Sequence, residues 1–281
     1  MLFRENLGPY LSIDEVALSK GELYTFVTNK SGRGRKNTII ACIKGTRSED
    51  ITRVLDMLTK EEKDQVLEVT MDLAKNMESA VKTSLPKANI VSDRFHVIKL
   101  AIEAIQRIRI DYRWEELEIE NDAIFKAKQA GKKYSPIVLP NGDTPKQLLA
   151  RSKYLITKKP NEWTQNQNER ADILFDRYLE IKEAYLHALL FRSIYEQKDA
   201  TKASYLFDMW IDKTFDEKHG YFYTVANTVQ SNFKNILNFF ITRNTNANAE
   251  SFNSKIKLFR SNLRGVCDTK FFLFRLANLF A

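Results

Sequence analysis

Residues 66–92 read VLEVTMDLAKNMESAVKTSLPKANIVS, and this stretch decides the fold. Residues 66–71 and 88–92 are short apolar runs, rich in β-branched side chains, that predict strands. The residues between them predict a helix over 75–85, which Pro86 ends. A strand, a crossover helix and a second strand pack as a right-handed unit with parallel strands, so the stretch predicts an α/β sheet.

Three more strands are predicted before this unit, at residues 10–16, 23–28 and 37–43. Short turn regions separate them, which makes them an antiparallel meander. A helix is predicted next because apolar residues recur at i, i+3, i+4 and i+7 from Ile51 to Leu58. The order β-β-β-α-β-α-β resembles the plan of ribonuclease H-like domains, an α/β class with a five-stranded mixed sheet.

Helical periodicity dominates the chain from residue 97 onward. One break, SPIVLPNGDTP at residues 135–145, holds three prolines and an Asn-Gly pair and predicts a loop. We therefore expect three segments. The first part of a ribonuclease H-like core occupies residues 1–98, a large all-helical insertion occupies 99–243, and closing helices of the core occupy 244–281.

The composition is that of a globular protein: 43% of the 281 residues are apolar, and 9 Gly and 6 Pro favour long helices over a many-stranded all-β fold. Cys42, Cys267 and the three histidines are too far apart for zinc-finger spacing, so any metal is expected on carboxylates. No apolar run approaches the roughly 18 residues of a membrane span, and the first residues lack the order of a signal peptide. We therefore expect a cytoplasmic protein.

Basic residues outnumber acidic ones by 44 to 36, which gives a formal net charge of +8, and they cluster. Residues 30–47 and 146–159 contain no acid, and residues 253–275 contain six basic residues against Asp268 alone. Such stretches are typical of a surface that follows nucleic-acid phosphates. Solvated faces of other proteins can be equally basic, so charge alone does not decide the function.

Three carboxylates form the candidate catalytic and metal-binding set: Asp14, Asp72 and Glu250. Asp14 interrupts the first strand and alternates onto the face opposite Glu15. Asp72 ends the fourth strand, which adjoins the first in this topology, and Glu250 begins the last helical region. Hard oxygen ligands suit Mg²⁺, and two such ions can stabilise the attacking and leaving oxygens of a phosphodiester displacement, with Mn²⁺ able to replace them. Taken singly, each acid is weak evidence, because an Asp that ends a strand is more often a turn or cap residue.

Five sequence blocks resemble bacterial insertion-sequence DDE transposases of the ISL-three family. They are LSIDE (11–15), VTMD (69–72), IVSDRFHV (90–97), NGDTP (141–145) and TNANAESFNSKIK (245–257). The resemblance runs through almost the whole chain. It implies a Mg²⁺-dependent transposase that cuts insertion-sequence ends and joins the freed 3′ hydroxyl to target DNA, with Asp14, Asp72 and Glu250 as its triad. It also implies a homo-oligomer on double-stranded DNA in the bacterial nucleoid.

Asp93 and His96 resemble an Asp-x-x-His signature of related transposases and are candidate accessory residues. His96 could orient a phosphate or a water molecule, or Asp93 could cap the helix that starts near His96 while Phe95 fills the sheet; both interpretations stay open. A triad in which Asp93 replaces Asp72 also stays open, because the fifth strand ends at the same edge. The candidate DNA-contacting residues are Arg94, Asn253, Lys255, Lys257 and Arg260.

The chain departs from the family in one respect. Members commonly carry an amino-terminal zinc-binding and helix-turn-helix region, whereas the first strand is predicted here from residue 10. We therefore expect either a separate protein that recognises the ends or a shortened copy of the family. Two other functions stay open: a catalytically inactive DNA-binding remnant, and a ribonuclease H-like nuclease that cleaves without strand transfer.

Overall fold

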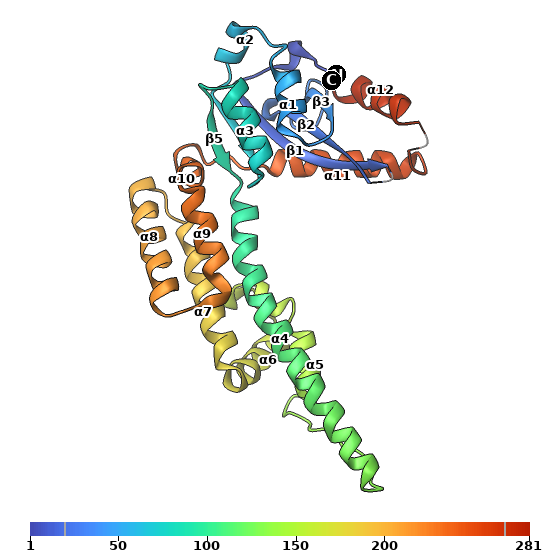
Figure 1. The fold of residues 1–281 in the computed structure, drawn as a ribbon, viewed down its shortest axis with the longest axis vertical. Helices are drawn as coiled ribbons and strands as arrows, with labels where there is room; N and C mark the ends of the chain where they lie inside the picture. The colour runs from blue at the N-terminus through green and yellow to red at the C-terminus, as the bar shows by residue number, and fades with distance from the viewer. Residues whose placement is uncertain (20, 267) are drawn as a thin grey trace. The chain divides into compact units, whose positions relative to one another are not determined.

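The computed structural model describes residues 1–19, 21–266 and 268–281, and these form two compact units (Figure 1). Residues 1–97 and 232–281 form a unit around a β-sheet, and residues 98–231 form a unit of helices. Lys20, in the predicted first turn, and Cys267 lie outside the described residues. No described helix is long and apolar enough to cross a membrane.

The sheet has five strands in the order β3-β2-β1-β4-β5. Strands β1, β2 and β3 are antiparallel neighbours, whereas β4 runs parallel to both β1 and β5. The predicted mixed sheet is thereby confirmed, in an order consistent with a ribonuclease H-like arrangement. The strands are β1 (Tyr10–Ser19), β2 (Glu22–Asn29), β3 (Ile39–Lys44), β4 (Glu68–Met71) and β5 (Asn89–Ser92).

The helices between the strands also follow the prediction, with one addition. The predicted helix near Ile51 is α1 (Ser48–Leu55), and the one before Pro86 is α3 (Lys75–Ser84). A short helix that periodicity did not predict, α2 (Lys60–Asp64), forms because the Thr59 side chain and Glu62 make a reciprocal capping box at its start.

The two faces of the sheet are covered by different helices (Figure 1). Leu11 and Ile13 of β1 point to the face where α1 and α3 pack, within a core that also contains Met77 and Val81. Val16 and Leu18 point to the other face, which is covered by helices α11 (Ala247–Asn262) and α12 (Thr269–Phe280). Odd and even residues of β1 therefore serve separate layers.

Helix α10 (Phe233–Thr242) belongs to the sheet unit, because it packs on β5 and Asn238 Nδ2 donates a hydrogen bond to the Ile90 carbonyl oxygen at 2.8 Å. Glu78 of α3 also accepts a hydrogen bond from Asn235 at 2.9 Å. The sheet unit accordingly resumes at Asn232, earlier than the boundary expected after residue 243.

The second unit is built from helices around an aromatic core in which Trp210, Phe191 and Phe207 are fully buried. The predicted proline-rich loop is present up to Thr144, and Pro145 starts the next helix. The helices are most of α4 (Arg94–Gln129), α5 (Pro145–Arg151), α6 (Gln165–Arg177), α7 (Leu179–Ile194), α8 (Ala200–Asp216) and α9 (Tyr223–Ser231). Short 3₁₀ turns complete the chain: η1 (Arg4–Asn6), η2 (Lys30–Gly32), η3 (Leu155–Thr157), η4 (Pro160–Glu162) and η5 (Gly220–Phe222).

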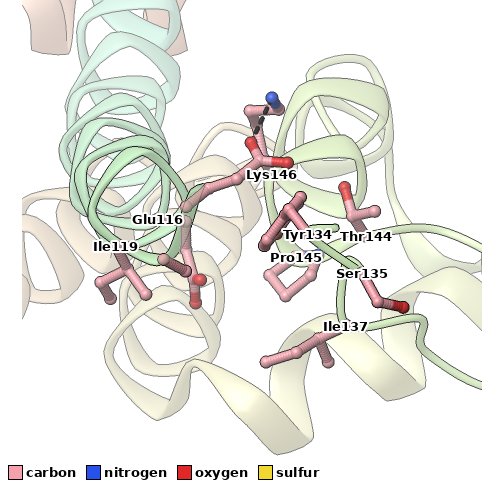
Figure 2. Close-up of a pocket in the computed structure, with 10 residues that line it drawn as sticks. Glu116, Ile119, Tyr134, Ser135, Ile137, Thr144, Pro145 and Lys146 are labelled. Atoms are coloured by element: carbon pink, nitrogen blue, oxygen red, sulfur yellow. Dashed lines mark ion pairs between the residues drawn. The ribbon is translucent and has the colours of Figure 1, made fainter. Parts of the chain in front are cut away.

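Two features of this unit concern its charged residues. Asp143 is 1% exposed and is paired with both Arg151 and Arg170, the latter at 3.2 Å. Nearby, a pocket between α4 and the start of α5 is lined by apolar residues such as Ile119 and Ile137 (Figure 2). Its charged residues include Lys146, which forms an ion pair with Glu120. The acids of this unit that are named here are therefore already matched by bases.

Candidate active site

Carboxylates gather where the parallel strands of the sheet end. Asp72 directly follows β4 and Asp93 directly follows β5. The parallel register pairs Ser12 of β1 with Thr70 of β4, and extending it by two residues brings Asp14 beside Asp72. Glu250 comes from the first turn of α11, the helix that covers this face of β1. The structure therefore brings Asp14, Asp72 and Glu250 into one neighbourhood.

Asp14 is the most strongly perturbed acid of this group. Burial raises its pKa from 3.8 to about 6, the Glu15 backbone N–H opposes this, and the charges of Asp72 and Glu250 raise it further. The charge of His96 opposes the effect of these two acids. Asp14 thus lies among other acids, with His96 as a basic neighbour.

Asn253 holds Asp14 from the opposing helix. Its Nδ2 donates a hydrogen bond to Asp14 Oδ2 at 2.6 Å, while the Glu15 N–H donates to Oδ1 at 2.8 Å. Asn253 Oδ1 is buried and has no hydrogen-bond partner. Asn253, expected to contact DNA, therefore orients an acid and presents a hard oxygen close to it. Glu15 hydrogen-bonds Asn76 on the other face, as the alternation of β1 predicts.

Asp93, His96 and Glu250 form a second cluster, in which one ligand atom from each lies within 4.8 Å of the others. His96 Nδ1 lies 3.1 Å from Asp93 Oδ2. The hydrogen bond that Asp93 accepts from His96 raises the pKa of His96 despite its partial burial, and the charges of Asp72 and Asp14 add to the effect. His96 is therefore a basic group that faces these acids.

Asp93 acts on α11 rather than on its own helix. It is 1% exposed, and its Oδ1 accepts the backbone N–H of Asn246 at 3.2 Å, directly before α11 begins. A carboxylate at that position accepts a hydrogen bond from a free N–H at the helix start, and its negative charge interacts favourably with the positive end of the helix dipole. The alternative in which Phe95 fills the sheet is wrong, because its side chain is 56% exposed.

The other candidate DNA-contacting residues lie at several places on the sheet unit. Arg94 is exposed and its guanidinium lies 5.6 Å from the Phe239 ring centroid. Lys255 Nζ donates a hydrogen bond to the Gly34 carbonyl oxygen at 2.7 Å. Lys257 and Arg260 line a cavity of about 380 Å³ at the far end of α11, together with Arg264, Ser261 and Gly265. Lys257 and Arg260 remain accessible to a polyanion.

Sequence reasoning missed the buried cluster of Lys30, Glu68 and Thr70. Lys30 Nζ lies 3.4 Å from Glu68 Oε1 and also contacts Thr70 Oγ1. Burial lowers the pKa of Lys30, which the charges of Glu68 and Asp93 oppose. Lys30 was counted only within a basic stretch, because burial of a lysine between strands cannot be read from local composition. The sequence did contain one signal of this cluster, which is the acid Glu68 within a predicted apolar strand. An acid in such a strand needs a buried basic partner.

The fold and the site define a class: an α/β protein in which a cluster of carboxylates, with a histidine beside it, lies where the parallel strands of the sheet end. The family model described as a transposase, DDE type of the ISL3 group, matches residues 11–276. The chain therefore belongs to the ISL3 family of DDE transposases.

One curated relative is the transposase for insertion sequence element IS1001 of Bordetella parapertussis, which is 33% identical over 105 residues. The matched stretch covers 36% of this chain and 25% of the Bordetella protein. No solved structure matches the chain.

Proposed function

We propose that this protein is the catalytic part of an insertion-sequence transposase, which hydrolyses the phosphodiester at the element's ends and transfers the freed strand to target DNA. The observation that supports it most is the convergence of Asp14, Asp72 and Glu250, with the raised pKa of Asp14. Carboxylates in this arrangement repel each other unless a cation or protons compensate them.

The residues present fit a divalent ion. Asp14, Asp72 and Glu250 offer hard oxygens, and the unpartnered Asn253 Oδ1 adds a further oxygen that a cation or its bound water would satisfy. Two Mg²⁺ ions, or Mn²⁺ in their place, would supply charge stabilisation for the attacking and leaving oxygens when bound. Asp72 suits this role better than Asp93, because both Asp93 oxygens already have partners and the residue is fully buried.

The remaining residues position this set. Asn253 fixes the Asp14 carboxylate from α11, and Asp93 holds the start of the same helix, three residues before Glu250. His96 holds a proton more tightly than a free imidazole does, because its hydrogen bond with Asp93 raises its pKa. In this proposal His96 and Asp93 are accessory to the chemistry, with His96 placed to donate to a phosphate oxygen.

The proposed partner is double-stranded DNA, bound by the basic residues of α11 and its ends. Among the basic residues of α11, Lys257 is exposed and Arg260 is partly exposed, and both line the cavity at the far end of the helix. We infer that the helical unit is an insertion into the ribonuclease H-like core and that the protein works as a homo-oligomer on nucleoid DNA in the cytoplasm.

The test is Asp14→Asn, assayed for Mn²⁺-dependent nicking of duplex DNA carrying the element's ends. We expect nicking to fall at least about 1,000-fold, since the substitution removes a charge used in the reaction, while DNA affinity is unchanged. Glu15→Gln is the matched control, because Glu15 is the next residue of β1 but faces α3.

Unchanged nicking by the Asp14→Asn variant would refute the assignment of the triad. Failure of calorimetry to detect Mn²⁺ binding to the unmodified protein would identify a DNA-binding remnant instead. A joining assay on marked ends separates a transposase, which produces joined strands, from a nuclease, which leaves only cut ones.

A further inference from the structure

The later half of helix α4, residues 110–129, has one side that packs on the helical unit and one side that faces solvent. On the packed side, Tyr112 donates a hydrogen bond to Glu180 at 2.9 Å and Glu116 pairs with Arg177 at 2.9 Å. Trp114 is two residues from both Tyr112 and Glu116, and two residues of an α-helix turn by about 200°. Trp114 therefore lies on the opposite side of the helix, where its side chain is 59% exposed.

Trp114 belongs to a stripe of apolar residues along this solvent-facing side. The members follow one another at intervals of three or four residues, with Asn121 in the intervening position, and this spacing places them on one face. They are Ile110, Trp114, Leu117, Ile124 and Phe125. Leu117 is partly exposed, and the other four are exposed, Phe125 by 60%.

The stripe is placed where a partner can reach it. Within the helical unit, the last turns of α4 extend past the neighbouring helices (Figure 1). Single apolar residues are ordinary on a protein surface, but a continuous apolar patch is typical of an interaction site. The composition of the stripe alone does not identify the partner.

The charges along the same half of α4 do identify one. Residues 115–122 contain five acidic residues and no basic one, and residues 126–133 contain four lysines and no acid. Exposed members of these two blocks are Glu115, Glu118 and Asp122 in the first and Lys126 and Lys128 in the second. A helix that is acidic in one block and basic in the next is complementary to an inverted copy of itself. An antiparallel pair places opposite blocks together, whereas a parallel pair places like charges together.

We propose that the stripe is the surface through which two copies of this chain pair, with their α4 helices antiparallel. Burial of the apolar side chains supplies the affinity, and the two charge blocks determine the direction of pairing. None of the proposed catalytic residues belongs to this surface. The inference deepens the proposed function by naming an interface of the homo-oligomer, and it rests on that function for the role of the pair on DNA.

The first experiment is sedimentation equilibrium of the full chain, without DNA or metal, from about 1 to about 100 μM. We expect an equilibrium between one chain and two. The dissociation constant should rise about 100-fold or more in Trp114→Glu and in Ile124→Glu, because each dimer then contains two charges in its apolar contact. Met209→Glu is the matched control and should leave the constant unchanged, since Met209 is 51% exposed on α8, outside the stripe.

The second experiment reverses the charge blocks and tests the direction of pairing. The variant Lys126→Glu/Lys128→Glu lowers the net charge of the chain by four from +8, so general repulsion between copies decreases and alone would tighten the dimer. Antiparallel pairing predicts the opposite, a dimer about 10-fold weaker, because two acidic blocks then meet. Adding Glu115→Lys/Glu118→Lys restores opposite blocks and should recover the original constant. In about 1 M salt these differences should vanish.

A single chain at every concentration would overturn the proposal, and so would stripe variants that remain dimers. Stripe variants that remain dimers but bind duplex DNA more weakly would identify a DNA-contacting surface instead. The charge-block variants change exposed residues only, so they keep the test decisive if Trp114→Glu fails to fold. An unchanged or tighter dimer in Lys126→Glu/Lys128→Glu would overturn the antiparallel arrangement. The proposed function fails separately, by the nicking assay of the Asp14→Asn variant.

Discussion

Asp143 in the helical unit and Asp14 in the sheet unit are both withdrawn from water, yet their surroundings are opposite. Asp143 is met by Arg151 and Arg170, whereas Asp14 is met by one amide and one backbone N–H among other acids. An acid with cationic partners holds a fold together. An acid among acids costs stability until a cation or a proton compensates it, so the contrast separates an acid paired within the fold from the acids proposed to be catalytic.

We expect the largest effect on stability from a substitution of Asp143, which removes the paired acid of this comparison. Asp143→Ala leaves two arginines unpaired beside a buried site, and we expect it to cost about 2–3 kcal/mol of unfolding free energy, less than for a fully buried pair because Arg151 is largely exposed. Urea unfolding followed by tryptophan fluorescence measures it, because all three tryptophans lie in this unit. Asp172→Ala, at an exposed position of α6, is the control and should stay within about 0.5 kcal/mol. Equal losses in both variants would contradict a special role of Asp143.

Asp93 is intermediate between Asp143 and Asp14, because its carboxylate is paired with a histidine and not with an arginine. Asp93→Asn should reduce nicking about 10- to 100-fold through the misplaced start of α11 and through His96. Because Asp93 positions other groups, the variant should still bind Mn²⁺ in calorimetry, unlike Asp14→Asn. Loss of Mn²⁺ binding in Asp93→Asn would instead support the triad in which Asp93 replaces Asp72.

The smallest expected effect is the decrease in the free energy of unfolding that the half-buried Asp14 carboxylate causes. Its pKa is higher in the folded protein, about 6 against 3.8, so the folded state binds the proton more tightly and unfolding free energy falls as pH rises through this range. Asp14→Asn should therefore stabilise the metal-free sheet by about 1–2 kcal/mol at pH 7, discounted for partial exposure, and by less at pH 5. Hydrogen exchange of β1 amides, corrected for intrinsic rates, measures this.

His187 provides the control of opposite sign within the same samples. Burial and the neighbouring His219 lower its pKa to about 3, so helices α7 and α8 should lose protection as pH falls below 6.5. If amide protection in β1 and in α7 changed in the same direction as the pH falls, the pKa directions assigned to Asp14 and His187 could not both be correct.

Much of the sheet was predictable because each strand carries its own signal. The apolar runs around Ile13 and Val69, with a crossover helix between β4 and β5, determine the strand order locally. The convergence of Asp14 and Asp72 then follows from topology. The exact ends did not follow: β3 begins at Ile39 rather than at residue 37, because Asn37 has φ 64° and cannot continue a strand.

The parts that were not predictable depend on contacts between residues distant in sequence. The hydrogen bond from Asn253 to Asp14 joins the first strand to a late helix, and the Asp93 contact with Asn246 joins β5 to the same helix. The ion pairs of Asp143 were equally hidden, since nothing local selects Arg170 as its partner. Periodicity reports which face a residue lies on, but not which residue meets it across a gap.

Helix α11 has a consequence for when the protein becomes able to act. Asp14, Asp72 and Asp93 belong to segments that a ribosome produces early, and strands β1 to β5 can assemble before the helical unit exists. Glu250 and Asn253 arrive more than 150 residues after Asp93. Under the proposed function, the nascent chain therefore lacks two of the proposed site residues until α11 has been translated, so a growing polypeptide beside its own gene could not cut that gene before then.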